Sequence, residues 1–153
     1  PAMTLLVPFD GSALSGAAID RAVQFADVFD DSVVAVAVIP RNDASYARER
    51  GWIDAGEPFD HETIVSRLRE QVDEHAPDAE FRVEGASRGV RAGSIARVIR
   101  RIAREEGASM VFVGSDNAGR LVTTLSSVGG NVASDPTYDV VIVRHDRPFP
   151  AER

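Results

Sequence analysis

The sequence contains no cysteine. It also contains no lysine, since all seventeen basic residues are arginine. The absence of cysteine excludes a thiol nucleophile, a disulfide framework and a thiolate metal site. The absence of lysine excludes a Walker-A lysine, the strand lysine of protein kinases and a Schiff-base lysine. Three large classes of nucleotide and cofactor enzymes are therefore excluded.

Long apolar runs are also missing. The longest, Val33 to Pro40, is far shorter than the ~20 residues that cross a bilayer. The sequence does not open on a basic segment followed by an apolar stretch, as a secretory signal would. We therefore expect a cytoplasmic protein with no membrane partner. Pro1 and Ala2 precede Met3, and we expect them to be a remnant of expression with no role.

The net charge of −7 argues against a nucleic-acid partner, since such binding depends on neutralising phosphates. An acidic, lysine-free surface would suit a high-salt cytoplasm, but the arginine bias can equally reflect genomic base composition. Both interpretations remain open. The length of 153 residues predicts one domain, expected over residues 3–146, with a tail at 147–153.

Strands and helices alternate along the chain. The apolar and alternating runs predict five strands: Thr4–Phe9, Val33–Ile39, Glu80–Glu84, Ser109–Val113 and Asp139–Arg144. Four helices are predicted: Leu14–Phe29 with a cap near Ser12, Asp60–His75, a helix capped by Ser94 and stopped by Gly107, and one beginning near Ser126. This order predicts an α/β fold, a parallel sheet with helices on both faces.

Ligands of such sheets bind beyond the carboxyl ends of the strands, where the strand order reverses. The turn at Asp10 and the loop at Gly114 both follow strands, so they would face one crevice if the first and fourth strands are neighbours. The stretch from Met110 to Ser134 has the pattern of a buried strand, a loop with a second glycine at 119 and a Ser/Thr-rich helix start. A helix start with glycines before it can bind phosphate, although an ordinary capped loop has the same pattern.

Three other features have plain interpretations. The segment from Pro40 to Pro58 lacks periodicity, which predicts a flexible excursion or lid. The three histidines, His61, His75 and His145, have no metal-ligand spacing, which predicts ordinary surface residues. The arginines at 97, 100, 101 and 104 predict a solvated helix face.

Three blocks in order, LLVPFDGS, VRAGSIARVIRRIAREEGASMVFVGS and GNVASDPTYDVVIVRH, resemble the universal stress protein family over nearly the whole chain. The resemblance implies a five-stranded parallel sheet of order 3-2-1-4-5, of the kind found in adenine nucleotide alpha hydrolases. It also makes strand 139–144 an edge strand. Pairing with a second copy would cover this apolar edge, so we expect a homodimer.

One branch of the family binds ATP through Gly-x2-Gly-x9-Gly-Ser/Thr, and this chain departs from that pattern. Gly114 matches the first glycine, but Asn117 occupies the second position and the next glycine is Gly119. After Gly119 and nine intervening residues come Gly129 and Gly130, a pair that lacks the hydroxyl of the motif. Counting back from Arg144 instead places Ser126 and Ser127 on the Gly-Ser pair. We prefer this second alignment, because it keeps the last helix at the family length.

The resemblance implies a site for ATP or AMP, with Mg²⁺ if a triphosphate binds. The adenine would lie against Pro8, Phe9 and Val38, and Asp10 would lie near the nucleoside, although an aspartate beside Gly11 also suits a plain turn. Arg120 and the serines would contact phosphate, while Asp116 would repel it unless a divalent cation intervenes. The implied binding residues are Pro8, Phe9, Asp10, Val38, Val113, Gly114, Asp116, Gly119, Arg120, Ser126, Ser127 and Val128.

The sequence therefore predicts a dimeric stress-response module that binds an adenine nucleotide. The alternative is a nucleotide-free dimeric interaction protein whose altered loop has lost the site. No catalytic residue and no resident metal are predicted. The chain would be at most a slow nucleotide hydrolase, because no general base beyond Asp10 or Asp116 is suggested.

Overall fold

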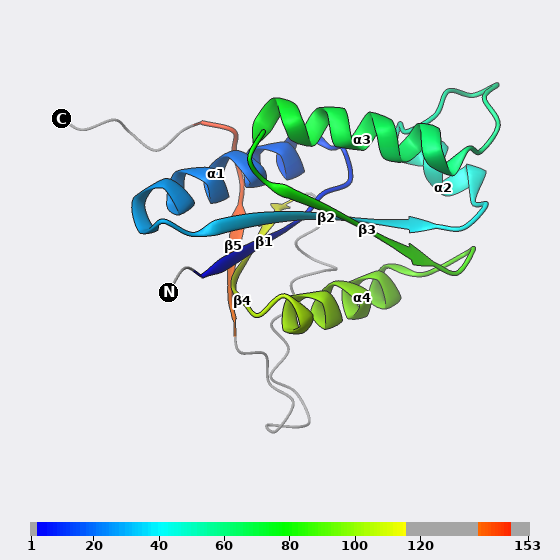
Figure 1. The fold of residues 1–153 in the computed structure, drawn as a ribbon. Coiled ribbons are helices and arrows are strands. Elements are labelled where there is room, and N and C mark those ends of the chain that lie inside the picture. The colour runs from blue at the N-terminus through cyan, green and yellow to red at the C-terminus, as the bar shows by residue number, and fades with distance from the viewer. Residues whose placement is uncertain (1–2, 116–137, 148–153) are drawn as a thin grey trace.

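The computed structural model describes residues 3–115 and 138–147. They contain one parallel sheet in the order β3-β2-β1-β4-β5, which confirms the predicted topology (Figure 1). The strands are β1 (Thr4–Pro8), β2 (Ser32–Pro40), β3 (Glu80–Ala86), β4 (Ala108–Gly114) and β5 (Asp139–Val143). The helices are α1 (Ala13–Phe29), α2 (Ala44–Glu49), α3 (His61–His75) and α4 (Ala92–Glu105).

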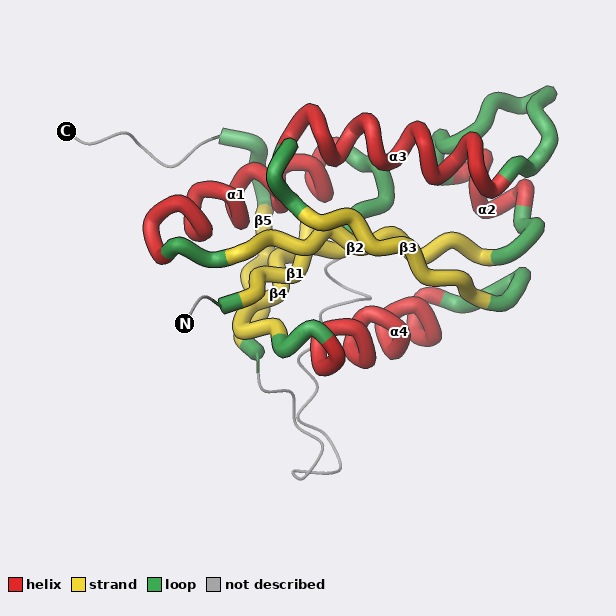
Figure 2. Tube along the Cα trace, viewed as in Figure 1, coloured by secondary structure: helices red, strands yellow, loops and turns green. Residues whose placement is uncertain are grey.

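The sheet is apolar on both faces, and helices cover each face (Figure 2). Successive side chains of a strand point to opposite faces. In β1, Leu5 and Val7 accordingly belong to the core cluster that contains residues of α1 and α3, whereas Leu6 belongs to the cluster that contains residues of α4. The predicted arrangement with helices on both faces is thus confirmed. No helix of residues 3–115 and 138–147 is long and apolar enough to cross a membrane.

Helix caps agree with the sequence for α1 and differ for α4. The Ser12 hydroxyl accepts a hydrogen bond from the Ser15 amide at 3.2 Å, as the cap of α1. The predicted cap of α4 at Ser94 is wrong, because the N-cap is Arg91, which makes no side-chain cap bond. The amides of Ser94 and Ile95 already donate to the Arg91 carbonyl, so the helix starts earlier through backbone bonds alone.

One predicted surface histidine has a structural role. His75 Nδ1 is hydrogen-bonded to Asp20 Oδ1 at 2.8 Å, which joins α3 to α1. Its ring lies against Gly16, where an added Cβ would come within 2.7 Å of His75 Nε2. The two helices pack closely at this point because Gly16 has no side chain. His61 and His145 are exposed, as predicted.

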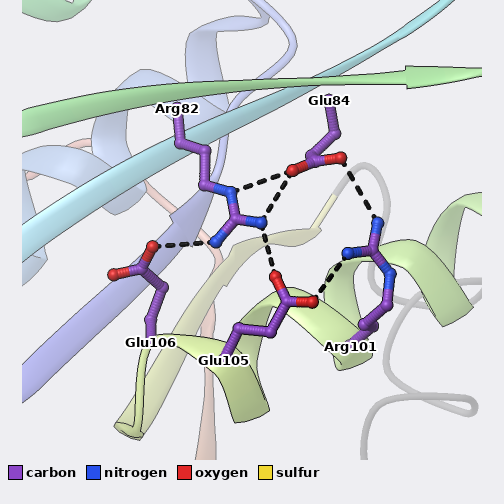
Figure 3. Close-up of polar contacts among 5 residues, drawn as sticks. All are labelled: Arg82, Glu84, Arg101, Glu105 and Glu106. Carbon is purple, nitrogen blue, oxygen red and sulfur yellow. Dashed lines mark hydrogen bonds and ion pairs between the residues drawn. The ribbon is translucent and has the colours of Figure 1, made fainter.

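A five-residue charge network joins β3 to α4 (Figure 3). Arg82 of β3 donates to Glu84 at 2.7 Å, to Glu106 at 2.9 Å and to Glu105. Arg101 joins Glu84 and Glu105 from the other side, at 3.3 Å and 2.9 Å. The Arg82 hydrogen bonds are the largest cause that lowers the pKa of both Glu84 and Glu105. Part of the predicted solvated arginine face therefore fastens the outer strand to its helix.

Gly114, at the end of β4, lies against the first turn of α1. A Cβ added to it would come within 2.7 Å of the Leu14 carbonyl carbon and 2.9 Å of the Ser15 amide nitrogen. These are backbone atoms of a helix, which cannot swing aside as a flexible side chain can. Glycine at 114 thus sets how closely α1 approaches β4.

We expect Arg82→Gln to lower the melting temperature at pH 7 by a few degrees, because three carboxylates lose a shared partner. A carboxylate whose pKa is lowered by folding stabilises the fold above its ordinary pKa of 4.5, and this contribution is lost as the pH falls through the lowered value. The difference between the wild type and the variant should therefore shrink below about pH 4. Thermal unfolding followed by circular dichroism between pH 7 and 3 measures it. The control is Arg97→Gln, on the exposed face of α4, and an equal loss in both variants would contradict the network's role.

We expect Gly114→Ala to lower the free energy of unfolding by about 1–3 kcal/mol, as overpacking does, with no ligand present. Urea denaturation gives the value. The control is Gly85→Ala in β3, where an added Cβ meets nothing within 4 Å. If the two variants were equally stable, Gly114 would have no packing role.

Candidate functional site

The carboxyl ends of β1, β2 and β4 lie side by side at one edge of the sheet (Figure 1). β1 occupies the centre, with Pro8 paired to Val36 of β2 and Leu6 paired to Val111 of β4. The chain passes from β1 to β2 on one side and later to β4 on the other, so the strand order reverses here. The turn at Asp10 and the end of β4 at Gly114 are thus brought to one edge, as predicted.

Asp10 organises the turn that follows β1. Its Oδ1 accepts hydrogen bonds from the Ser12 amide and the Ser15 hydroxyl, both at 3.0 Å. Gly11 has a φ of +84°, in the left-handed region that favours glycine. Ser15 is buried, so the bond to its hydroxyl satisfies a polar group inside the protein. The turn-forming interpretation of Asp10 is therefore confirmed.

The residues expected to hold the adenine do not form one side-chain surface. Phe9 is buried in the cluster that contains α1 and α3, whereas Val38 and Val113 are buried in the cluster with α4. The alternation of strand residues places the side chains of Phe9 and Val38 on opposite faces of the sheet.

Half of the predicted site lies outside the described residues. This group contains Asp116, Gly119, Arg120, Ser126, Ser127 and Val128, together with the predicted fourth helix start. Gly114 is among the described residues. Its close approach to α1 requires glycine whether or not a phosphate binds. Its presence in the sequence is therefore explained by packing as well as by the family motif.

The segment after β2 differs from the sequence prediction. The expected flexible excursion over 40–58 contains the helix α2, whose Ala47 is buried, and the buried side chains of Trp52 and Ile53. The prediction was wrong because the segment packs onto the end of the sheet and has too few apolar positions for a periodicity. The sequence signal that could have predicted α2 is Asp43, because aspartate is a preferred N-cap residue and here caps this helix.

Trp52 anchors this segment to the turn after β1. Its indole Nε1 donates to the Asp10 carbonyl at 2.7 Å, and its own carbonyl accepts from Arg67 of α3 at 2.8 Å. Arg67 is held in turn by Glu57 at 2.7 Å. The segment after α2 is thus connected to both the turn after β1 and α3.

Asp43 holds the other end of α2. Its Oδ1 accepts from the Tyr46 amide at 3.0 Å, and its Oδ2 accepts from the Gly89 amide at 2.9 Å. These backbone bonds lower the pKa of Asp43, with a smaller contribution from the charge of Arg88. The carboxylate therefore ties α2 to the loop between β3 and α4.

Tyr46 stands between the two halves of the core at this edge. It packs against both core clusters, and its ring centroid lies 5.6 Å from that of Trp52. Arg50 lies over its ring, 4.6 Å from the centroid, and donates to the Tyr46 hydroxyl at 3.2 Å. Burial raises the pKa of Tyr46, and the charges of Asp10 and Asp43 raise it further, against the effect of Arg50. Sequence reasoning missed Tyr46 and Arg50, because α2 was not predicted.

The opposite edge of the sheet carries a different depression, of about 590 Å³, near the amino ends of the strands. Its lining includes six acidic residues: Asp27, Asp30, Asp31, Asp78, Glu80 and Glu106. No group of three or more His, Cys, Asp or Glu side chains among residues 3–115 and 138–147 could hold a metal ion. We place the candidate site at the carboxyl edge, because the strand order reverses there.

Comparisons with known proteins agree with this fold. The model of the universal stress protein family matches residues 2–144. No curated protein matches the chain. Among solved structures, a universal stress protein in complex with cAMP is 24% identical, with 93% of this chain and 96% of that chain covered and a TM-score of 0.55.

Two further structures are similar. A universal stress family protein from Burkholderia pseudomallei is 23% identical, over 92% of this chain and 94% of that chain, with a TM-score of 0.54. The universal stress protein of Archaeoglobus fulgidus in complex with dAMP is 16% identical, over 93% and 98%, with a TM-score of 0.52. Because the family model covers nearly the whole chain, and the sheet has the order 3-2-1-4-5, this protein belongs to the universal stress protein family.

Proposed function

We propose that this chain is a dimeric stress-response module that binds an adenine nucleotide at the carboxyl ends of β1 and β4. The observation that carries the proposal is the adjacency of these two strands, which puts the Asp10 turn and Gly114 at the point where the strand order reverses. Solved relatives of the same fold hold cAMP and dAMP, which supports a nucleotide as the ligand class.

In this proposal the nucleoside lies near Pro8 and Asp10 and is bordered by Val38 and Val113. The phosphates lie at the start of the helix predicted near Ser126 and Ser127, with Gly119 and Arg120 in the preceding loop. Unpaired amides of a helix start and an arginine fork are both suited to phosphate oxygens. Mg²⁺ would accompany a triphosphate and screen it from Asp116.

A nucleotide-free interaction protein is the second candidate. The observation that favours it is the contact between Gly114 and the backbone of α1, because this glycine would be required even if no phosphate bound. The replacement of the second motif glycine by Asn117 favours it as well. A substitution of Gly114 cannot separate the two candidates, since it would disturb packing in either case.

We expect AMP, and ATP with Mg²⁺, to bind saturably to the purified chain. Trp52 is the only tryptophan and contacts Asp10, so its fluorescence should change on binding. Calorimetric titration gives the affinity. The double variant Ser126→Ala/Ser127→Ala should bind at least about tenfold more weakly, because two phosphate contacts are lost.

The control for this experiment is Ser45→Ala, at an exposed position of α2. It should bind as the wild type does. If the folded wild type gives neither heat nor a fluorescence change with either nucleotide, the nucleotide-free candidate is correct.

We also expect a dimer through β5, whose outer side pairs with no strand among residues 3–115 and 138–147. Light scattering at micromolar concentration should give twice the chain mass of 16.5 kDa. Ile142→Lys should shift the protein toward the monomer, since a charged side chain opposes strand pairing at an edge. Val28→Lys, at an exposed position of α1, is the control. A wild type that stays monomeric would rule out this dimer.

A further inference from the structure

Arg50, at the carboxyl end of α2, carries a buried polar atom without a partner. Its Nε is buried and makes no hydrogen bond within the described part of the chain. The guanidinium is fixed by Tyr46, through the ring beneath it and through the hydroxyl at 3.2 Å. An arginine side chain has five N–H donors, the bond to Tyr46 uses one of them, and the residue as a whole is only partly buried. An unsatisfied buried donor in a native structure calls for an explanation, such as a bound water or ion or a functional role.

A chain of contacts joins the guanidinium to the turn after β1, at the proposed nucleotide site. Arg50 lies on Tyr46, Tyr46 packs against Trp52, and the Trp52 indole donates to the carbonyl of Asp10. The Asp43 carboxylate accepts from the Tyr46 amide, and the Asp10 carbonyl accepts from Trp52, so both acidic residues are bonded to the same aromatic pair as Arg50. This chain of contacts is held in place, because Asp43, Trp52 and Arg67 fasten its ends to three other elements.

The charges at this corner select the kind of ligand group. Tyr46 is bonded to an acidic residue and to a basic one, since its amide donates to Asp43 at 3.0 Å and its hydroxyl accepts from Arg50 at 3.2 Å. A further phosphate would meet two carboxylates, whereas a hydroxyl can donate to a carboxylate and accept from a guanidinium. A mixed set of donors and acceptors beside an aromatic ring is suited to the sugar part of a nucleotide.

We propose that Arg50, held against Tyr46, recognises the ribose of the bound nucleotide by donating to a ribose hydroxyl oxygen. This inference rests on the proposed function. It adds which part of the nucleotide the α2 segment contacts. It makes the site selective for ribonucleotides over deoxyribonucleotides. Arg50 is a binding residue in this scheme, and Tyr46 is a positioning residue.

The test compares AMP, 2′-deoxyAMP and 3′-deoxyAMP by calorimetric titration of the full chain. We expect the wild type to bind AMP about 3- to 10-fold more tightly than at least one deoxy analogue, the range that one hydrogen bond supplies. Arg50→Met keeps the apolar stem on Tyr46 and removes every donor. It should bind AMP no more tightly than that analogue, while its affinity for the analogue itself stays unchanged.

Arg48→Met is the matched control, since Arg48 is exposed on the same helix and should keep the wild-type preference. Equal affinities of the wild type for all three nucleotides, or an unchanged preference in Arg50→Met, would overturn the role of Arg50 and leave the proposed nucleotide site intact. Failure of the wild type to bind any of the three would instead overturn the proposed function, and this inference with it. If Arg50→Met does not fold, Arg50→Lys, which retains one donor group and the charge, should show a reduced preference, and an unchanged one would contradict the proposal.

Discussion

The central position of β1 is the constraint on which the rest of this structure depends. The strand is hydrogen-bonded to β2 on one side and to β4 on the other, and Leu5, Leu6 and Val7 are buried. A strand with apolar side chains on both faces must be covered by helices twice, which requires α1 and α3 on one side and α4 on the other. The reversal of strand order at its carboxyl end follows from the same arrangement and creates the place for a ligand.

The turn after β1 is held both by residues at the start of α1 and by a segment that is distant in the sequence. Ser15 and Ser12 fix the Asp10 carboxylate from within α1, and Trp52 fixes the Asp10 carbonyl from the segment after α2. Groups held in this way lose little further freedom when a ligand binds, so less of the interaction energy is spent on ordering them. The same bonds explain why a segment without periodicity forms part of the wall rather than a lid.

Residues that the family motif assigns to ligand binding can also have a structural role in this chain. Gly114 allows α1 to approach β4, and Asp10 satisfies a buried hydroxyl. The arginine face of α4 likewise contributes Arg101 to the network around Arg82, in which the cations and carboxylates satisfy one another. A motif in this family therefore does not by itself distinguish a site from a structural corner. The distinction requires groups whose bonding capacity the fold leaves unused, such as Arg50 Nε.

The sequence by itself determined the strands, most helices and the strand order, because apolar periodicity is local and the three family blocks span the chain. It also identified Asp10 and Gly114 as neighbours at one edge of the sheet. Only the tertiary structure decided that Phe9 and Val38 face opposite sides, that α4 begins without a side-chain cap, and that Trp52, Tyr46 and Arg50 form the wall beside Asp10. These features depend on contacts between residues as far apart as Asp10 and Trp52, which no local pattern encodes, since the apolar positions that bury α2 are too few to form a period.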